Sequence, residues 1–534
     1  MVSAEITNEA PNFSSITKAG GNDGDISHLE AILSEEDTKK RPDHALVDPE
    51  VAKYAAQRAV HIDEATNKRL KRLIDRRLLA VMVGTYFLQA LDKGTISFVA
   101  IMGIREDTHL VGQQASTHWL TTCIYIAILI VEYPTNWIIQ RVPIAKYLAV
   151  NIILWGVTLA MHAVCHDFAG LLVARTVLGI LEAVCQPTFI LLSATWYTRE
   201  EQSVISITWF LMAGLQQIIG GLLGYAFSNI PTWSPIKSWQ ILYVAYGSLS
   251  VIWGFFVLFW MPDSLTRAKC FTEEEKALMI ERVRKNQTGI QNRVFRKEQV
   301  WEAFKDPQTY AFCVIQITTT IPSGGLSSFS AILIQSFGFG LLQTQLLAMV
   351  PGAVQIFAML IAVYFERKYK QTALTMLAGT LAPMAATVVF LAVPWSLDTR
   401  NGLLVAYYLI WSFYAAVGLL FPLISRNVAG QTKKATVIAT TFVFWAAGNA
   451  AGPQAFQSRE APRYFTAFAV QLTCWVTLAV TLIFLRAYYI VQNKRRDKKV
   501  AEGTATADDD LVHGFEDVTD IVIMLMLRSS GELH

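Results

Sequence analysis

Two charged residues, Arg175 and Glu182, stand within an otherwise apolar stretch of helical length, Leu171–Gln202. They are seven residues apart, so a helix places them two turns apart on one face. An ionised side chain in a bilayer core costs at least about 2.5–3.5 kcal/mol, and such residues usually face a partner or a water-filled space. The pair therefore indicates a polar pathway across a membrane.

Two more ionisable residues, Asp92 and Lys93, lie in the first apolar span. If this span enters the bilayer near Leu78, Asp92 lies about 20 Å in. A fourth span of opposite direction brings Arg175 to a comparable depth and Glu182 near the middle. We expect Asp92 to pair with Arg175 in one state, and Glu182 to lack a permanent partner. Both acids are candidate proton-coupling residues. The alternative is a static link, in which Arg175 and the two acids hold helices one and four together.

Five polar residues inside apolar spans are candidates for substrate binding: Lys93, Arg175, Gln216, Gln217 and Asn449. Lys93 could hold a substrate carboxylate or extend to the membrane surface, and Arg175 could act as a substrate clamp. The three amides could bond to a polar solute or join helices to each other.

Helix-breaking residues interrupt two of the later spans. Pro322 precedes Gly324 and Gly325 in the seventh span, and Gly448 and Pro453 bracket a similar stretch in the eleventh. We expect a break in the helix at both places. Each break leaves backbone N–H and C=O groups that must bond to other parts of the protein or face a cavity, and each can act as a hinge.

The composition identifies the class of protein that positions these residues. Hydrophobic residues make up 53% of the 534 residues and charged residues only 16%, which is too apolar for a soluble globular protein. The sequence predicts an all-α membrane protein, and its net charge of +3 gives no sign of a nucleic-acid partner. Twelve apolar stretches, each long enough to cross a core of about 30 Å, lie near 78–101, 117–139, 147–165, 169–194, 203–227, 239–261, 310–334, 341–365, 373–394, 403–424, 435–457 and 465–490.

Lys and Arg residues collect in alternate loops, which predicts that both termini are cytoplasmic. We expect a disordered tail over 1–75 that ends in a short amphipathic helix, a six-helix half over 76–262, a cytoplasmic loop over 263–309, a second six-helix half over 310–493 and a cytoplasmic tail over 494–534. The alternating charges of the loop favour short surface helices with a solvated face. Two six-helix halves around a central cavity are the architecture of major facilitator transporters.

Signatures of other function classes are missing from the sequence. It has no phosphate-binding loop, catalytic triad or metal-ligand spacing, and its six cysteines mostly fall singly inside apolar spans. We expect no enzyme activity, no metal site and no cofactor. A proton gradient is the expected energy source.

Ordered motifs along residues 65–500 resemble one known family. They include FLQALDKGTIS (87–97), PTNWIIQRVPIAKYL (134–148), ARTVLGILEAVCQPTF (174–189), WYTREEQ (196–202), PSGGLSSFS (322–330), NVAGQTKKA (427–435) and GNAAGPQAF (448–456). The chain resembles the fungal allantoate permease family, the anion:cation symporter branch of the major facilitator superfamily. The resemblance implies a secondary transporter that imports a small organic anion with protons across a fungal plasma membrane. Substrates of the family include ureides, short peptides and vitamins such as nicotinate, pantothenate and biotin.

More distant carboxylate:proton symporters also have an acid in helix one and an Arg/Glu pair in helix four, which supports Asp92, Arg175 and Glu182 as site residues. A rival interpretation is a transporter of a secondary-metabolite gene cluster, which moves a pathway compound, including by efflux. A nutrient sensor is a third interpretation. We expect a monomer in the lipid bilayer, either of the plasma membrane or of an intracellular membrane.

Overall fold

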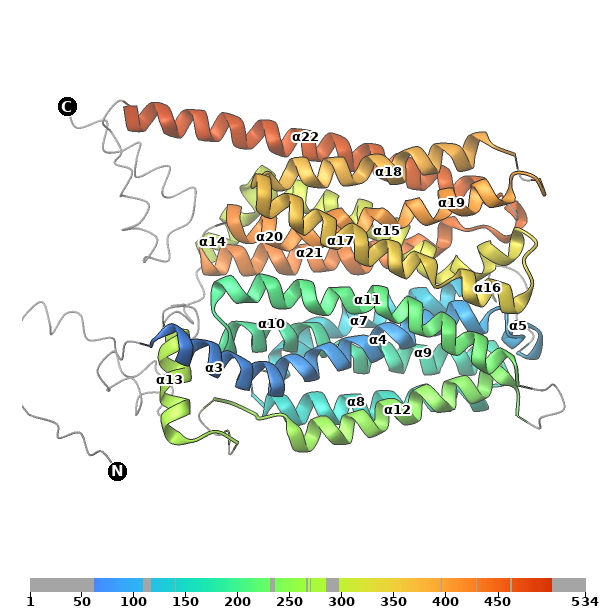
Figure 1. Ribbon diagram of the computed structural model, residues 1–534, viewed down its shortest axis with the longest axis horizontal. Helices are drawn as coiled ribbons and strands as arrows, with labels where there is room; N and C mark the ends of the chain where they lie inside the picture. Colours follow the sequence, from blue (N-terminus) through green and yellow to red (C-terminus); the bar gives the residue numbers. More distant parts are fainter. Residues whose placement is uncertain are drawn as a thin grey trace, which may run out of the picture. The chain divides into compact units, whose positions relative to one another are not determined.

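The computed structural model describes residues 62–108, 117–139, 141–230, 236–265, 268, 270–284, 297–394, 396–428, 430–461 and 463–501. All of them belong to one compact unit of the chain, Ala59–His534. Most of the tail predicted over 1–75, and the end of the chain after Ala501, lie outside the described residues. The described residues are helical, with short connections (Figure 1).

The first half of the chain begins with a short helix and continues into the first group of long helices. Its elements are α3 (Glu64–Ile74), η3 (Asp75–Leu79), α4 (Ala80–Val99), α5 (Ile104–Asp107), α7 (Thr117–Ile139), α8 (Ile144–Met161), η4 (His162–Val164), α9 (Phe168–Glu182), α10 (Cys185–Trp196), α11 (Arg199–Ser228) and α12 (Ser238–Trp260).

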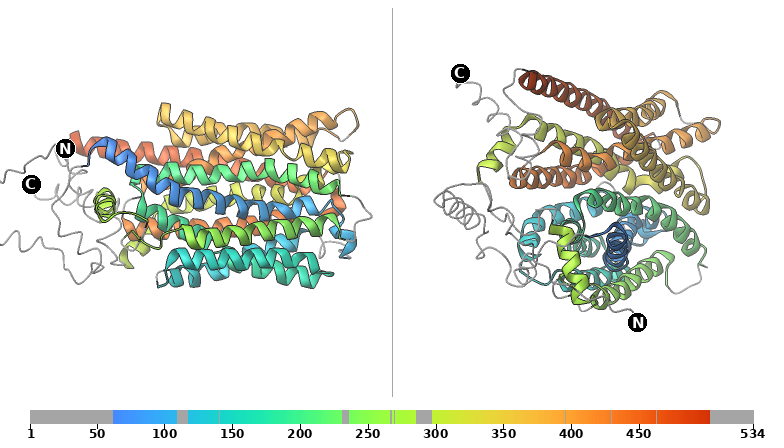
Figure 2. Two further views of the ribbon diagram at one scale, coloured as in Figure 1. Left: turned by 60° about the horizontal axis from the view of Figure 1, so that its bottom comes forward. Right: turned by 60° about the vertical axis from the view of Figure 1, so that its left-hand side comes forward.

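Two connecting helices, α13 (Glu273–Arg284) and α14 (Lys297–Lys305), precede the second group. Its elements are α15 (Pro307–Ser336), α16 (Leu341–Leu347), α17 (Val350–Tyr369), α18 (Thr372–Ala392), α19 (Arg400–Ile410), η5 (Trp411–Phe413), α20 (Tyr414–Asn427), α21 (Gln431–Ala451), η6 (Gly452–Ala455), η7 (Ser458–Glu460) and α22 (Phe465–Ala501). Figure 2 shows the two groups as separate helix clusters that lie against each other.

Each group has its own hydrophobic core. One cluster of buried apolar residues comes from the first group with α3 and α13, and the other comes from the second group with α14 and with Phe98 of α4. Within the first group α8 packs along α12, and Gly156 and Gly247 stand at this crossing. A Cβ on Gly247 would lie 2.6 Å from the backbone nitrogen of Ala160, so the crossing requires glycine.

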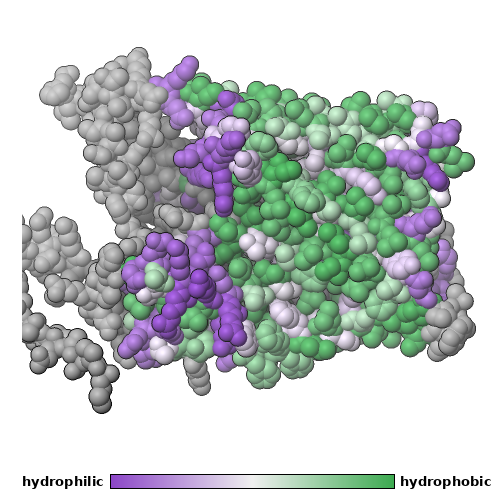
Figure 3. Space-filling model, in the orientation of Figure 1, coloured by the Kyte–Doolittle hydropathy of each residue, from purple (hydrophilic) through white to green (hydrophobic). Residues whose placement is uncertain are grey.

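Ten helical segments among the described residues are long and apolar enough to cross a membrane. Of the two remaining predicted spans, α4 is made less apolar by Gln89, Asp92 and Lys93, and the apolar part of α7 ends early, at Glu132. The count of twelve spans therefore stays a prediction. Figure 3 shows a hydrophobic band along the helices, with hydrophilic side chains at the two ends.

The two ends of the bundle differ in what they carry. The helices α3, α13 and α14 lie at one end together with the end of α22, and α5 and α16 lie at the other (Figure 1). We call these the α13 end and the α16 end. The sequence predicts that the α13 end faces the cytoplasm, and this assignment stays a prediction.

Three local features differ from the sequence-based expectations. The seventh span is one continuous helix, α15, which runs through Pro322. Hydroxyls of the preceding threonines donate to carbonyls of the previous turn, as from Thr318 to Val314. The fourth span is instead broken after Glu182, and α22 continues past residue 493 to Ala501. The expected break in the eleventh span is present, since α21 ends at Ala451 and the 3₁₀ turn η6 follows.

The connecting helix α13 is held on the first half by buried charge. Arg282 donates to the Asn67 side chain of α3 at 2.6 Å and forms an ion pair with Glu201 of α11. Its side chain is only 3% exposed. The alternating charge pattern predicts a solvated face, and for Arg282 this prediction is wrong. Burial also raises the pKa of Asp75, which stands near this cluster.

Candidate functional site

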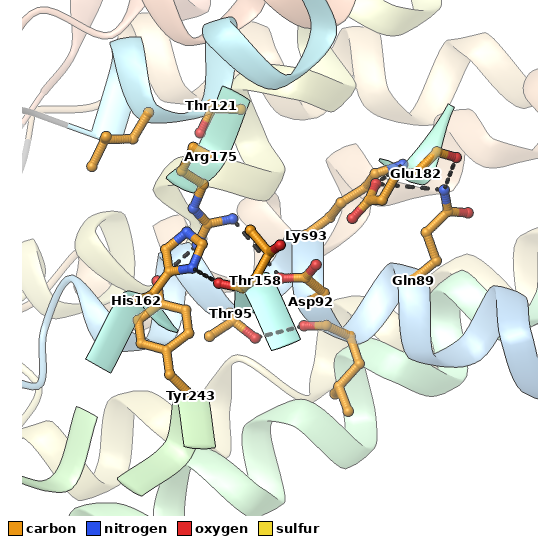
Figure 4. Close-up of polar contacts among 12 residues, drawn as sticks. Gln89, Asp92, Lys93, Thr95, Thr121, Thr158, His162, Arg175, Glu182 and Tyr243 are labelled. Carbon is orange, nitrogen blue, oxygen red and sulfur yellow. Dashed lines mark hydrogen bonds and ion pairs between the residues drawn. The ribbon is translucent and has the colours of Figure 1, made fainter. Parts of the chain in front are cut away.

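The break in the fourth span places a carboxylate at the end of a helix inside the bundle. The helix α9 ends at Glu182, and α10 begins at Cys185, two residues before Pro187. Proline lacks the N–H that an unbroken helix needs at this position. The side chain of Gln89 in α4 faces the freed turn, and its amide lies 3.4 Å from the Glu182 carbonyl and 3.5 Å from the Glu182 carboxylate (Figure 4).

Glu182 has an ionic partner in the structure, in contrast to the expectation from the sequence. The Lys93 ammonium lies 3.0 Å from Oε2 of Glu182. The Glu182 side chain is fully buried, and 22% of the Lys93 side chain is exposed. The prediction that Glu182 lacks a permanent partner is therefore wrong for this state. Lys93 reaches into the bundle toward α9, and it does not extend to the membrane surface.

Asp92 and Arg175 form the second ion pair, as the comparable depth of the two residues predicts. Nη1 of Arg175 lies 3.9 Å from Oδ1 of Asp92, a distance that permits ionic attraction but no hydrogen bond. Both side chains are 1% exposed. Trp155 donates to the other Asp92 oxygen at 2.9 Å, and Arg175 donates to the Tyr243 hydroxyl at 2.7 Å. This pair is enclosed by the first half of the chain.

An aromatic layer supports the enclosed pair from the α16 end. The ring of His162 stacks on Tyr243 at 5.0 Å between centroids, and its Nδ1 bonds to the carbonyl of Thr158 (Figure 4). The stacked rings hold Tyr243 where its hydroxyl can accept from Arg175. The guanidinium is thus held by Tyr243 of α12 and Asp92 of α4, and with its side chain 1% exposed it is out of reach of a ligand in this state.

The two pairs together form a cluster of four charges with no net charge when both acids are ionised. Asp92 and Glu182 are close enough to repel each other in that state. Arginine and lysine keep their charge across the physiological pH range. One proton on either acid gives the cluster a net charge of +1, and one bound monovalent anion neutralises it again.

The three candidate amides lie around this cluster in different ways. Gln216 of α11 packs against Gly94, next to Lys93 on α4, and its amide nitrogen has no hydrogen-bond partner among the described residues. Gln217 packs against Gly352 of α17, at the border between the halves. The Asn449 amide donates to the Trp445 carbonyl of its own helix at 2.9 Å. Gln216 is therefore the amide with a free donor near the cluster, and the roles of all three stay predictions.

Hydrogen bonds join the two halves between the charge cluster and the α16 end. The Ala331 amide donates to the Ser97 hydroxyl at 3.1 Å. Thr121 and Thr122 of α7 bond to Ser328 and to Gln454, at 3.2 and 3.1 Å. These contacts hold the halves together at this end.

Several residues of the site carry no sequence signal that separates them from ordinary membrane residues. Trp155 and Tyr243 stand in apolar stretches, where an aromatic residue is typical of a core or of the membrane interface. Tyr125 and Trp445, whose rings meet at 5.5 Å, join α7 to α21. The only available signal was the polar tip of each residue, which needs a partner when it is buried.

Comparison with known proteins places the chain among transporters. A model of the Major Facilitator Superfamily matches residues 82–453. An uncharacterized transporter of Schizosaccharomyces pombe is 34% identical, over 86% of this chain and 89% of that protein. The allantoate permease of Saccharomyces cerevisiae is 31% identical, over 86% of each chain. The crystal structure of a bacterial homolog of the human lysosomal transporter Spinster, inward-facing and unoccupied, matches with a TM-score of 0.57 at 14% identity, over 76% of this chain and 95% of that chain.

Proposed function

The chain belongs to the Major Facilitator Superfamily and is a transporter, and we propose that it imports a small organic anion together with protons by alternating access. The similarity to an allantoate permease supports an organic anion as the substrate, because allantoate carries a carboxylate. The proposal covers ureides, vitamins with a carboxylate, short peptides and simple carboxylates. The proposal also places the transporter in the plasma membrane.

The observation that carries the proposal is the ion pair between Lys93 and Glu182, beside the enclosed pair of Asp92 and Arg175. When one partner of a buried ion pair is neutralised, the other partner is left as an uncompensated buried charge. A proton on Glu182 leaves the Lys93 ammonium without its counter-ion. A substrate carboxylate then takes the place of the Glu182 carboxylate beside Lys93.

This exchange couples the anion to the proton. With Glu182 ionised, Lys93 is occupied and the anion binds weakly. With Glu182 protonated, the cluster has a charge of +1 and attracts a monovalent anion. With both the proton and the anion bound, the cluster is neutral again. The protein then changes from one access state to the other without moving net charge across the membrane. Release of the proton restores the ion pair and expels the anion. One proton moves with each monovalent anion.

The test uses purified protein in liposomes that contain a pH-sensitive dye. Radiolabelled allantoate is added first, followed by a panel of small carboxylates. We expect anion addition to acidify the lumen, and an inward proton gradient to drive anion accumulation. Glu182→Gln should abolish both effects and retain exchange of labelled for unlabelled anion.

A matched control is Glu366→Gln, which neutralises a buried acid of α17 that is paired with Arg426, remote from the four-charge cluster. This variant should keep proton movement. Anion uptake by the unaltered protein that ignores the pH gradient would contradict the proposal. Uptake and efflux assays in cells that produce the protein then separate import from the rival interpretation of export.

A further inference from the structure

A chain of aromatic side chains near Lys93 runs from the first half of the protein into the second half and back to the first. Neighbouring ring centroids along it are 5.5, 6.2, 5.8, 6.1 and 6.0 Å apart. These separations are those of interacting aromatic pairs. We call this chain the aromatic arc; its members in order are Tyr125, Trp445, Phe442, Phe421, Phe210 and Tyr86.

Both halves contribute to the aromatic arc, and the arc passes beside the charge cluster at Trp445. Lys93 stands 5.8 Å from the centroid of the Trp445 ring. At the other end, Tyr86 lies two turns before Lys93 on the same helix, α4. Phe210 of α11 stacks on Phe421 of α20 at an interplanar angle of 18°, and this contact joins the halves. The arc therefore borders the cationic centre from α4 to α21.

Most rings of the arc are partly exposed, unlike the large aromatic residues of the two cores. Trp155, Tyr243 and Trp475 are fully buried within their halves. Five members of the arc are instead partly exposed, although they lie at the border between the halves; they are Tyr86, Phe210, Phe421, Phe442 and Trp445. Ring surface of this kind next to an ammonium group suits a ligand that is flat, apolar and negatively charged at one edge.

We propose that the preferred substrate is an aromatic or heteroaromatic monocarboxylate, whose carboxylate binds Lys93 and whose ring lies against Trp445 and Phe442. This inference rests on the proposed function for the contact between the carboxylate and Lys93. A single carboxylate matches the +1 charge of the protonated cluster. A flat ring gains stacking and edge-to-face contacts that a puckered, saturated ring of the same size does not make.

The test measures binding by calorimetry with the purified full-length protein at mildly acidic pH. The probes are benzoate and cyclohexanecarboxylate, which have the same carboxylate and the same number of ring carbons. We expect benzoate to bind about tenfold more tightly. Trp445→Leu and Phe442→Leu should each reduce this ratio several-fold, because they weaken the binding of benzoate more than that of cyclohexanecarboxylate, whereas Trp445→Phe should keep most of the preference.

Phe256→Leu is the control, because Phe256 of α12 is exposed and stacks on Trp260 outside the arc. It should preserve the ratio. Equal affinities of the unaltered protein for the two probes would overturn the inference, as would a ratio that survives both leucine substitutions. Binding of neither probe, with allantoate still moving protons, overturns the inference and leaves the proposed function intact. If no organic anion moves protons, the proposed function itself fails.

Discussion

Substitution of Glu182 by Gln gives the sharpest test of the charge cluster. At an effective dielectric constant of about 20, opposite unit charges 3.0 Å apart attract each other by about 5.5 kcal/mol. The substitution removes this attraction but keeps the shape of the side chain and one oxygen that accepts from Lys93. A substrate carboxylate at a similar distance would restore an attraction of similar size. The full 5.5 kcal/mol is an upper limit, since coupling between two ligands is typically about 1–3 kcal/mol, or about 5–150-fold in affinity.

The expected result is an affinity that no longer depends on pH. In the unaltered protein the anion should bind about 5–150-fold more tightly at low pH than at high pH. The Glu182→Gln protein should bind with the high affinity at every pH, because its Lys93 is always free of the carboxylate. Calorimetry across a pH series measures both curves. The charged groups that face Glu182 are Lys93 and Asp92, so Asp92→Asn is measured alongside.

A measurement of thermal stability shows whether the Glu182→Gln protein is folded, and so separates a change in binding from a loss of folding. Removal of one partner from a buried ion pair costs up to about 3–5 kcal/mol, so the Glu182→Gln protein should melt at a lower temperature. Bound anion should then raise its Tm more than that of the unaltered protein, because the anion supplies the missing counter-charge. A variant that binds the anion with unchanged pH dependence would refute the assignment of Glu182. So would a Tm that the anion does not raise.

Three further outcomes are expected. Tyr243→Phe removes the 2.7 Å hydrogen bond to Arg175 and should lower the free energy of unfolding by about 1.5–3 kcal/mol, seen as a lower Tm, with little change in anion affinity. Gly247→Val forces a side chain into α8 and should cost about 1–3 kcal/mol, whereas Gly402→Ala, which meets nothing within 4 Å, should not lower the Tm. Burial raises the pKa of Asp75, so its contribution to stability is full below the unfolded pKa of about 3.9 and is lost as the pH rises through the raised pKa; Asp75→Asn should flatten this part of the plot of Tm against pH.

Depth along a helix could be predicted from the sequence, because each residue adds a fixed rise. This is why the contact between Asp92 and Arg175 was predictable. The direction in which a side chain points also depends on how each helix is rotated against its neighbours, and packing decides that rotation. The contact between Lys93 and Glu182 depends on this rotation, so it could not be predicted from the sequence. The break after Glu182, which lets Gln89 face the freed turn, was not predicted either.

Helix-breaking residues were the least reliable signal. Pro322 lies inside the continuous helix α15, and the following Gly324 and Gly325 serve close packing against Asn449 and Gly452. A glycine pair has the same sequence whether it forms a hinge or a contact. In the same way, the buried tip of Trp155 could be assigned to Asp92 only once the fold had brought the two side chains within hydrogen-bond distance.

The unequal exposure of the two ion pairs divides the work between them. A pair in which both side chains are 1% exposed, and in which each donates to or accepts from a residue outside the pair, has no room for a ligand. Its attraction at 3.9 Å, about 4.3 kcal/mol at the same dielectric constant, links α4 to α9 in this state. The pair of Lys93 and Glu182 has one accessible member, and that member is the cation. Under the proposed function, an anion therefore reaches the cluster through Lys93, and a change of charge on Glu182 admits it. In this proposal the enclosed pair of Asp92 and Arg175 keeps its own charges balanced, so that one proton on Glu182 and one anion at Lys93 also leave the whole cluster neutral.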